Sequence, residues 1–319
     1  MTDYCISSGI VSSGIMLNYD SMTVLSGGTA TDVTVNSGEI RVEGGTVNHT
    51  TLNGGSMHVA GGVVNHIVNS RGNIDIDDSG IANDTILISG SMTLLNGVAN
   101  RTSLSGNRHD DMGGILDINT GGTANSTFVN TGGFMQVWTG MAVSSFINSG
   151  GTIRFYGNGF VNNTVVNGGM VIISGSGTMS DTIVSSSGVM FVYQGIADNT
   201  FIDDGGSVKL GNGTMTHTTI NTGGNMVFSG GGMATHTTIN TGGSMTLDGT
   251  AIHTTINSGG NMTLFSNGMA DNTTIHSGGG MAVGSGGWGR VNNTTVDVGG
   301  TINGFQLLSD NYYSEGVHI

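Results

Sequence analysis

Three histidines have the spacing that most directly suggests chemistry in this sequence. His217, His236 and His253 occur 19 and 17 residues apart in similar Thr-rich surroundings. Imidazole nitrogens are common ligands for zinc, copper and nickel, so these residues are the candidate metal ligands of the chain. The simpler interpretation is a polar surface position that holds histidine where other repeats hold Asn, Asp or Ser. We therefore expect no metal and no cofactor.

Acidic residues supply a second candidate. Asp75, Asp77 and Asp78 form a cluster in which Asp75 and Asp77 are expected to point outward between inward Ile74 and Ile76. Paired carboxylates can serve glycoside hydrolysis or calcium binding. Because no neighbouring repeat supplies matching acids, we interpret the cluster as a solvated surface.

These residues are positioned by an internal repeat. Each repeat contains one apolar residue, here called the anchor, and sixteen anchors recur about 19 residues apart between Met16 and Val296. The anchors are Met16, Val35, Leu52, Val68, Leu87, Leu104, Val129, Ile147, Val166, Val184, Ile202, Ile220, Ile239, Ile256, Ile275 and Val296.

The longest interval between anchors contains the candidate binding loop. Leu104 and Val129 are 25 residues apart, and the extra residues fall near Asn107, Arg108, His109, Asp110 and Asp111. Insertions in repeat proteins often project on a binding face, so we predict a protruding loop here. A tolerated surface insertion is the alternative.

Two columns of residues support this register. The position five before the anchor is apolar throughout, as in Ala234 and Ala251, whereas the position three before it is polar. The polar column is Asp32, His49, Asn65, Asp84, Arg101, Ser126, Ser144, Asn163, Asp181, Asn199, His217, His236, His253, Asn272 and Asn293. One position is therefore expected inside and the other outside along the whole repeat array.

Glycine turns and a second apolar pair complete each repeat. Asn-x-Gly-Gly commonly follows the anchor, and alternating residues such as Met226 and Phe228 come next. Short strands of this kind bury their apolar faces only when equivalent strands stack in parallel. The prediction is an all-β fold, a single-stranded parallel β-helix (β-solenoid) of about 16 coils of about 19 residues. We expect an N-terminal cap or first coil at 1–15, repeats at 16–304 and a C-terminal cap at 305–319.

Composition excludes several functions. The net charge is −14, and the seven Lys and Arg residues form no run, so we expect no nucleic-acid binding. No apolar stretch is long enough to span a membrane as a helix. The first residues lack the basic and apolar regions of a standard signal peptide, and the single Cys5 excludes an internal disulfide.

The repeats resemble a known family. Gly232–Gly243 (GMATHTTINTGG) and Gly121–Gly133 (GGTANSTFVNTGG) are similar to the AIDA-type repeats of self-associating autotransporter adhesins. The resemblance covers roughly residues 8 to 305. It implies a right-handed β-helix passenger, secreted or displayed on the bacterial cell surface, that mediates adhesion, self-association or biofilm formation. It also implies an O-glycosyltransferase partner, for which the exposed Thr-Thr dipeptides would be acceptors.

The predicted function is therefore a non-catalytic adhesin-like passenger whose partner is itself or a host glycan or protein. The expected self-association surface is part of the polar column, namely Asn163, Asp181, Asn199, His217, His236, His253 and Asn272. The alternative is a carbohydrate-active β-helix such as a polysaccharide lyase, a hydrolase or a phage-tail fibre. A third hypothesis is a non-catalytic glycan- or ice-binding surface. The sequence leaves the ligand open.

Overall fold

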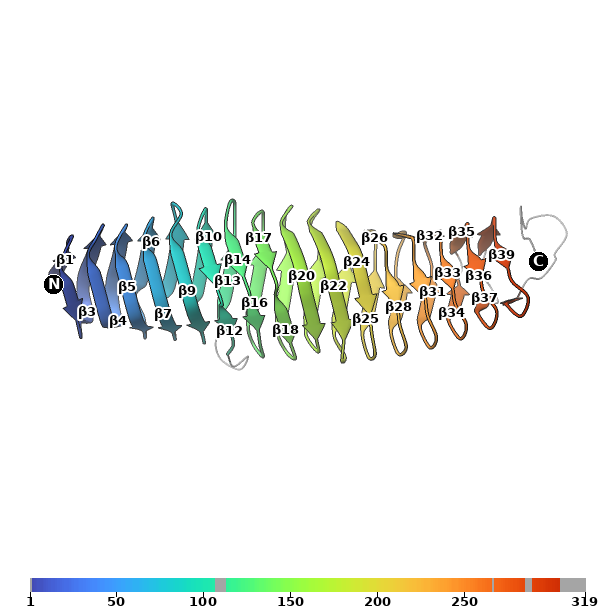
Figure 1. Ribbon diagram of the computed structural model, residues 1–319, viewed down its shortest axis with the longest axis horizontal. Coiled ribbons are helices and arrows are strands. Elements are labelled where there is room, and N and C mark those ends of the chain that lie inside the picture. Colours follow the sequence, from blue (N-terminus) through green and yellow to red (C-terminus); the bar gives the residue numbers. More distant parts are fainter. Residues whose placement is uncertain (1, 107–112, 266, 285–288, 305–319) are drawn as a thin grey trace. The chain divides into compact units, whose positions relative to one another are not determined.

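The computed structural model describes residues 2–106, 113–265, 267–284 and 289–304. The chain divides into two compact units, residues 1–164 and 165–319. Within each unit, parallel strands from successive coils lie side by side (Figure 1). These described residues contain strands and no helix, and the predicted parallel β-solenoid of about 16 turns is confirmed. Accordingly, they include no helix long and apolar enough to cross a membrane.

A coil has three segments. The first and second segments are joined by a bend, at which one residue takes a left-handed backbone conformation, such as His49 with φ 52°. Glycine-containing turns separate the second segment from the third, and the third from the next coil. Inward and outward side chains alternate along every segment, so each coil contributes only a few residues to the core.

In seven coils the bend lies inside one continuous strand. These strands are β4 (Thr29–Glu43), β5 (Thr46–Leu52), β7 (Val63–Asn69), β9 (Ile81–Leu87), β20 (Phe160–Asn167), β22 (Thr178–Ser185) and β24 (Ile196–Ile202). Strand β4 continues through the turn into the third segment, and so does β3 (Met16–Leu25), which begins after the bend of the first coil at Gly14.

Elsewhere the first segment is a separate strand. These strands are β2 (Val11–Ser13), β11 (Val98–Asn100), β14 (Thr123–Asn125), β17 (Met141–Val143), β26 (Thr214–Thr216), β29 (Met233–Thr235), β32 (Thr250–Ile252), β35 (Met269–Asp271) and β38 (Arg290–Asn292). The separate second segments are β12 (Ser103–Leu104), β15 (Phe128–Val129), β18 (Phe146–Asn148), β27 (Thr219–Ile220), β30 (Thr238–Ile239), β33 (Thr255–Ile256), β36 (Thr274–Ile275) and β39 (Thr295–Val296).

The third segment forms its own ladder. Its strands are β1 (Asp3–Ile6), β6 (Ser56–Ala60), β8 (Asn73–Asp77), β10 (Ser91–Leu95), β13 (Ile115–Ile118), β16 (Phe134–Val137), β19 (Thr152–Phe155), β21 (Met170–Ile173), β23 (Val189–Val192), β25 (Ser207–Leu210), β28 (Asn225–Phe228), β31 (Ser244–Leu247), β34 (Asn261–Leu264), β37 (Gly280–Val283) and β40 (Thr301–Asn303). Strand β1 already pairs with β3, so the ladder includes residues assigned to the expected N-terminal cap.

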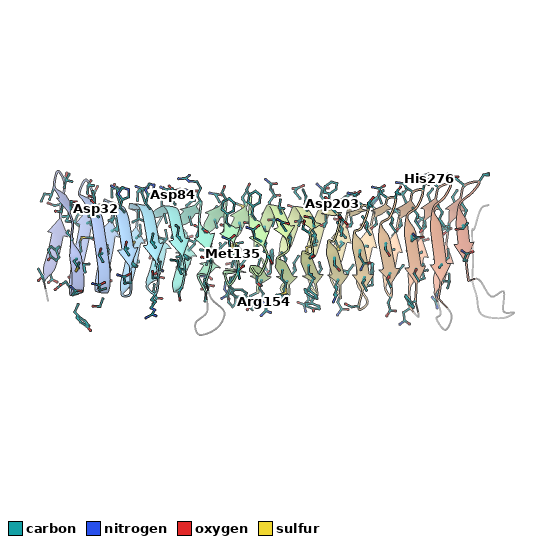
Figure 2. All side chains as sticks on the ribbon, turned by 90° about the horizontal axis from the view of Figure 1, so that it is seen from below. Asp32, Asp84, Met135, Arg154, Asp203 and His276 are labelled. Atoms are coloured by element: carbon teal, nitrogen blue, oxygen red, sulfur yellow. The ribbon has the colours of Figure 1, made fainter. Side chains whose placement is uncertain are left out.

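The core consists of stacked, equivalent side chains. Most anchors, such as Leu52 and Ile239, have no exposed surface, and the residues five before them are equally buried. Methionines of the third segment, such as Met135, also point inward (Figure 2). Methionine is flexible enough to fill the irregular gaps of so narrow a core.

Two predicted anchors were wrong by one position. Leu17, rather than the exposed Met16, is buried in the first coil. In the fourth coil the register places Asn69 beside Leu52 and Leu87. Asn69 is fully buried because its amide satisfies the Gly72 backbone, donating to the carbonyl at 2.8 Å and accepting from the N–H at 2.7 Å. The polar column of that coil therefore contains His66 in place of Asn65.

The two glycines of a turn pair are needed for different reasons. Gly242 has φ 71°, a left-handed conformation that costs glycine nothing. Gly243 instead lies against the preceding coil, and a Cβ built on it would be 2.5 Å from the carbonyl oxygen of Ile220. The first glycine thus supplies a conformation, and the second supplies space.

We expect Gly243→Ala to lower the free energy of unfolding by about 1–3 kcal/mol, because the added methyl group overpacks against backbone. Ser244→Ala, on the exposed neighbour, is the control and should change it by less than about 0.5 kcal/mol. Urea unfolding measures the free energy of unfolding of both variants, and hydrogen exchange around Ile220 locates the change. If the two substitutions lower the free energy of unfolding equally, the close contact of Gly243 is contradicted.

Candidate binding surface

The bends of successive coils align into an outward column, here called the bend column. In the unit of residues 1–164 it is Asp32, His49, His66, Asp84, Arg101, Ser126, Ser144 and Asn163. In the unit of residues 165–319 it is Asp181, Asn199, His217, His236, His253, Asn272 and Asn293. All these residues have φ between 45° and 56°.

Backbone conformation explains much of the polarity of this column. Asn, Asp and His are the non-glycine residues enriched in the left-handed region. At this bend the backbone N–H also pairs with the next coil, as in the 3.0 Å bond from His217 to the Thr235 carbonyl. The polar residues are thus required by the turn itself, and their side chains project outward from it.

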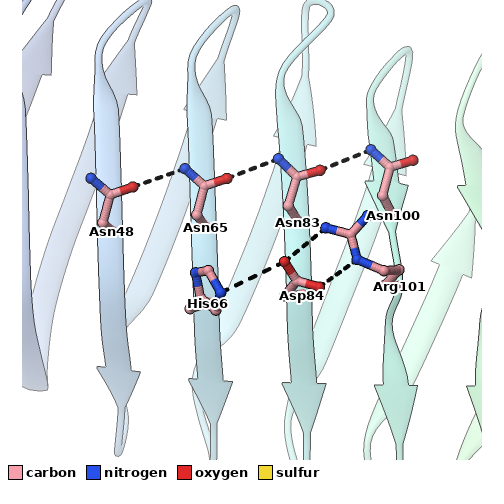
Figure 3. Close-up of polar contacts among 7 residues, drawn as sticks. All are labelled: Asn48, Asn65, His66, Asn83, Asp84, Asn100 and Arg101. Carbon is pink, nitrogen blue, oxygen red and sulfur yellow. Dashed lines mark hydrogen bonds and ion pairs between the residues drawn. The ribbon is translucent and has the colours of Figure 1, made fainter.

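In the first unit, the bend column from Asp32 to Arg101 is a run of polar and stacking contacts. His49 lies 4.0 Å from Asp32 and stacks on His66 with ring centroids 5.0 Å apart. His66 lies 3.8 Å from Asp84, and Arg101 donates to both oxygens of Asp84 at 2.5 and 2.8 Å (Figure 3). These contacts order five consecutive side chains on the surface.

The Asp84–Arg101 pair shifts both ionisation equilibria. The bond from Arg101 holds the pKa of Asp84 below its usual value, with smaller attractions to the charges of Arg101 and His66. In return, Asp84 raises the pKa of the Arg101 guanidinium. Both groups are exposed to solvent, so the pair orients side chains more than it stabilises the coil.

A groove of about 670 Å³ runs beside the bend column of the first unit. One wall is the charged column, and the other is formed by outward residues of the second segments. The lining residues are Asp32, Val33, Thr34, His49, Thr50, Thr51, His66, Ile67, Val68, Asp84, Thr85, Ile86, Arg101 and Ser103. The groove therefore offers charge on one side and apolar or hydroxyl groups on the other.

In the second unit, the three candidate histidines stack. The rings of His217 and His236 are 5.2 Å apart and those of His236 and His253 are 5.0 Å apart, with interplanar angles of 21° and 20°. Lone pairs of parallel rings point the same way rather than toward one ion. Within the described ranges, no three His, Cys, Asp or Glu side chains are grouped to hold a metal ion. A smaller groove of about 360 Å³ includes His236, His253 and Asn272.

The other members of the expected self-association surface have partial partners. Asn163 donates to the Ser144 hydroxyl at 3.1 Å, and Asn199 donates to Asp181 at 2.6 Å. Each amide retains a second N–H and oxygen lone pairs. The surface can thus bond further groups without breaking its own contacts.

Sequence reasoning did not identify the columns of asparagine whose amides bond from coil to coil. In the first unit, amide bonds of 2.8 to 2.9 Å join Asn48, Asn65, Asn83, Asn100 and Asn125. Figure 3 draws this ladder from Asn48 to Asn100. In the second unit, Asn221, Asn240 and Asn257 follow the anchors and are joined at 2.7 to 2.8 Å. The recurring Asn beside the bend and after the anchor was the available signal.

The acidic candidates lie in and directly after β8. Asp75 and Asp77 do point outward, and Asp77 accepts a contact of 2.7 Å from His58 in the preceding coil. Asp78 lies in a left-handed turn with φ 44°. The predicted binding loop, Asn107 to Asp111, lies outside the described residues.

The expectation that both residues of each Thr-Thr dipeptide are exposed was wrong. Thr218, Thr237, Thr254 and Thr273, the first of each pair, are at most 1% exposed because they follow the bend on its inward side. Their outward neighbours Thr219, Thr238, Thr255 and Thr274 are partly exposed. Only one hydroxyl of each pair is therefore available to an enzyme.

The chain is similar to known proteins at the level of solved structures. No family model and no curated protein sequence matches the chain. Among solved structures, a TibC-catalysed hyper-glycosylated fragment of TibA is similar, with 27% identity and a TM-score of 0.52. The match covers 99% of this chain and 94% of that one.

We expect Arg101→Gln to raise the pKa of Asp84, because the substitution removes the charged donor that favours its ionised form. A depressed pKa means that the pair stabilises the folded state above the ordinary pKa of Asp and that this contribution is lost as pH falls through the folded value. Carboxyl-carbon NMR titration measures the shift. His66→Gln is the matched variant and should raise it less; the reverse order would contradict the assignment.

Proposed function

We propose that this chain is a non-catalytic, adhesin-like passenger that is secreted or displayed on a bacterial surface and associates with copies of itself. The AIDA-type repeat pattern supports this proposal, as does the similarity to the TibA fragment over nearly the whole chain. The proposed partners are a second copy of the chain, a host glycan or protein, and an O-glycosyltransferase.

Self-association is supported by the amide side chains of the bend column, whose hydrogen-bonding capacity is only partly used within the chain. Asn163 and Asn199 each donate one hydrogen bond to the preceding coil and keep a second N–H and the amide oxygen for another molecule. Since an amide both donates and accepts, one copy of this surface complements another. Adhesion and biofilm formation would follow from many such weak contacts in parallel.

A catalytic alternative has less support. The acidic cluster predicted from the sequence contains Asp77, whose carboxylate contacts His58, and Asp75, which points into solvent. A polysaccharide lyase or hydrolase would require acids and bases converging on a substrate cleft. We therefore propose binding rather than bond cleavage.

Sedimentation velocity of the full chain over a range of protein and salt concentrations should reveal reversible assembly. The double variant Asn163→Gly, Asn199→Gly should weaken it by about tenfold or more, because it removes two contact side chains while glycine keeps their left-handed backbone. Thr246→Ala, an outward residue of β31, is the control and should assemble normally. A strict monomer at high concentration would overturn self-association.

Glycosylation of the folded chain should follow accessibility. After co-expression with TibC, we expect peptide mass spectrometry to find sugars on Thr219, Thr238, Thr255 or Thr274 and none on Thr218, Thr237, Thr254 or Thr273, because the second group lies in the coil interior. Circular dichroism of the same sample serves as the folding control. Modification of the buried set in folded protein would contradict the proposal.

A further inference from the structure

A second surface lies on the third segments of the first unit. In β13, β16 and β19, the residues Asp117, Gln136 and Arg154 occupy equivalent outward positions in successive coils. Their neighbours along the strands, such as Met135, are buried. In Figure 2, Arg154 lies on the opposite edge of this unit from Asp32 and Asp84. The patch is therefore separate from the bend column.

Two aromatic side chains border this row. Trp138 and Tyr156 follow β16 and β19, and their rings stack with centroids 4.6 Å apart and an interplanar angle of 19°. Trp138 is 40% exposed and Tyr156 is 38% exposed. The preceding coil has Asn119 at the equivalent position, so among the residues that the structure describes no aromatic ring stacks on the other face of Trp138. Large aromatic surface is thus held rigid in water.

The polar row beside the rings has unmet hydrogen-bonding capacity. Asp117 Oδ1 and Arg154 Nε are buried from solvent and have no hydrogen-bond partner. Burial raises the pKa of Asp117, which is the expected effect of desolvating a carboxylate. Arg154 Nη1 donates to the Tyr156 hydroxyl at 3.2 Å, and its guanidinium carbon lies 5.6 Å from the ring centroid. Buried polar atoms without partners are rare and call for an explanation.

Asp117, Gln136 and Arg154 differ in whether they donate or accept hydrogen bonds. A carboxylate only accepts, an amide does both, and a guanidinium only donates, so the row matches a set of hydroxyl groups. One negative and one positive charge cancel, which favours an uncharged ligand over a strongly charged one. Exposed rings beside such groups suit a molecule that has one apolar face and a polar edge.

We propose that Asp117, Gln136, Arg154, Trp138 and Tyr156 form a binding site for a neutral oligosaccharide. The C–H groups of one pyranose face pack on the free face of Trp138, since the negative ring face attracts polarised C–H bonds. Adjacent hydroxyl groups donate to Asp117 Oδ2, exchange bonds with Gln136 and accept from Arg154 Nη2, because Asp117 Oδ1 and Arg154 Nε are covered. The chain then has a glycan-binding site in addition to the self-association surface on the bend column. Neither of these two sites depends on the other.

The test is binding of the full chain to neutral oligosaccharides, with cellohexaose, maltohexaose and lacto-N-tetraose as probes and oligogalacturonate as the charged comparison. We expect at least one neutral probe to bind, measured by isothermal titration. Trp138→Ala and Asp117→Asn should each weaken it about tenfold or more. Phe128→Ala is the matched control, because Phe128 is 41% exposed and stacks on Phe146 in another segment.

Thermal unfolding shows whether each variant folds, and sedimentation separates this site from the self-association surface. Trp138→Ala should assemble like the parent chain while losing the sugar. Three results would overturn the proposal: no neutral probe binds, both variants bind as tightly as the parent, or Trp138→Ala abolishes assembly instead. The last result would show that the aromatic pair is a contact between copies of the chain.

Discussion

Parallel hydrogen bonding between successive coils is the constraint on which the rest of the structure depends. Each backbone bond fixes a residue beside its equivalent in the next coil, as in the pairing of Thr238 with Thr255 and of Ile239 with Ile256. Equivalent positions must then satisfy the same requirement: apolar inside, left-handed at the bend, small in the turn. This shared requirement produces the columns of similar residues that recur along the sequence.

This constraint made the fold predictable and the surface less so. Alternation of apolar residues and the glycine turns predicted a parallel solenoid of about 16 coils, which the structure confirms. The errors arose where one residue type can serve two purposes. Asn69 takes an apolar position because its amide bonds the turn that follows, and hydrophobicity alone selected Val68. Threonine was harder still, because Thr237 and Thr238 have the same side chain on opposite sides of the backbone.

The bend column illustrates why polarity alone does not identify a binding site. A left-handed residue is commonly Asn, Asp or His whether or not anything binds it. What distinguishes particular coils is the local arrangement: stacked rings at His236 in one unit, and a bidentate ion pair with a groove beside it at Asp84 in the other. None of these contacts is visible in a single repeat, because each joins side chains of different coils. Sequence therefore predicted the column, and structure was needed to describe its surface.

The long interval in the first unit has a consequence for how such chains change over generations. Asn125 donates to Asn100 across 25 residues at 2.9 Å, the same length as the bond across 17 residues between Asn83 and Asn100. Contacts between coils thus depend on equivalence of position and not on the amount of chain connecting them. An exchange between two misaligned gene copies that removes or adds one whole repeat would join equivalent positions again. Coil number can then drift by recombination while every interface is preserved, and extra residues accumulate only between the strands.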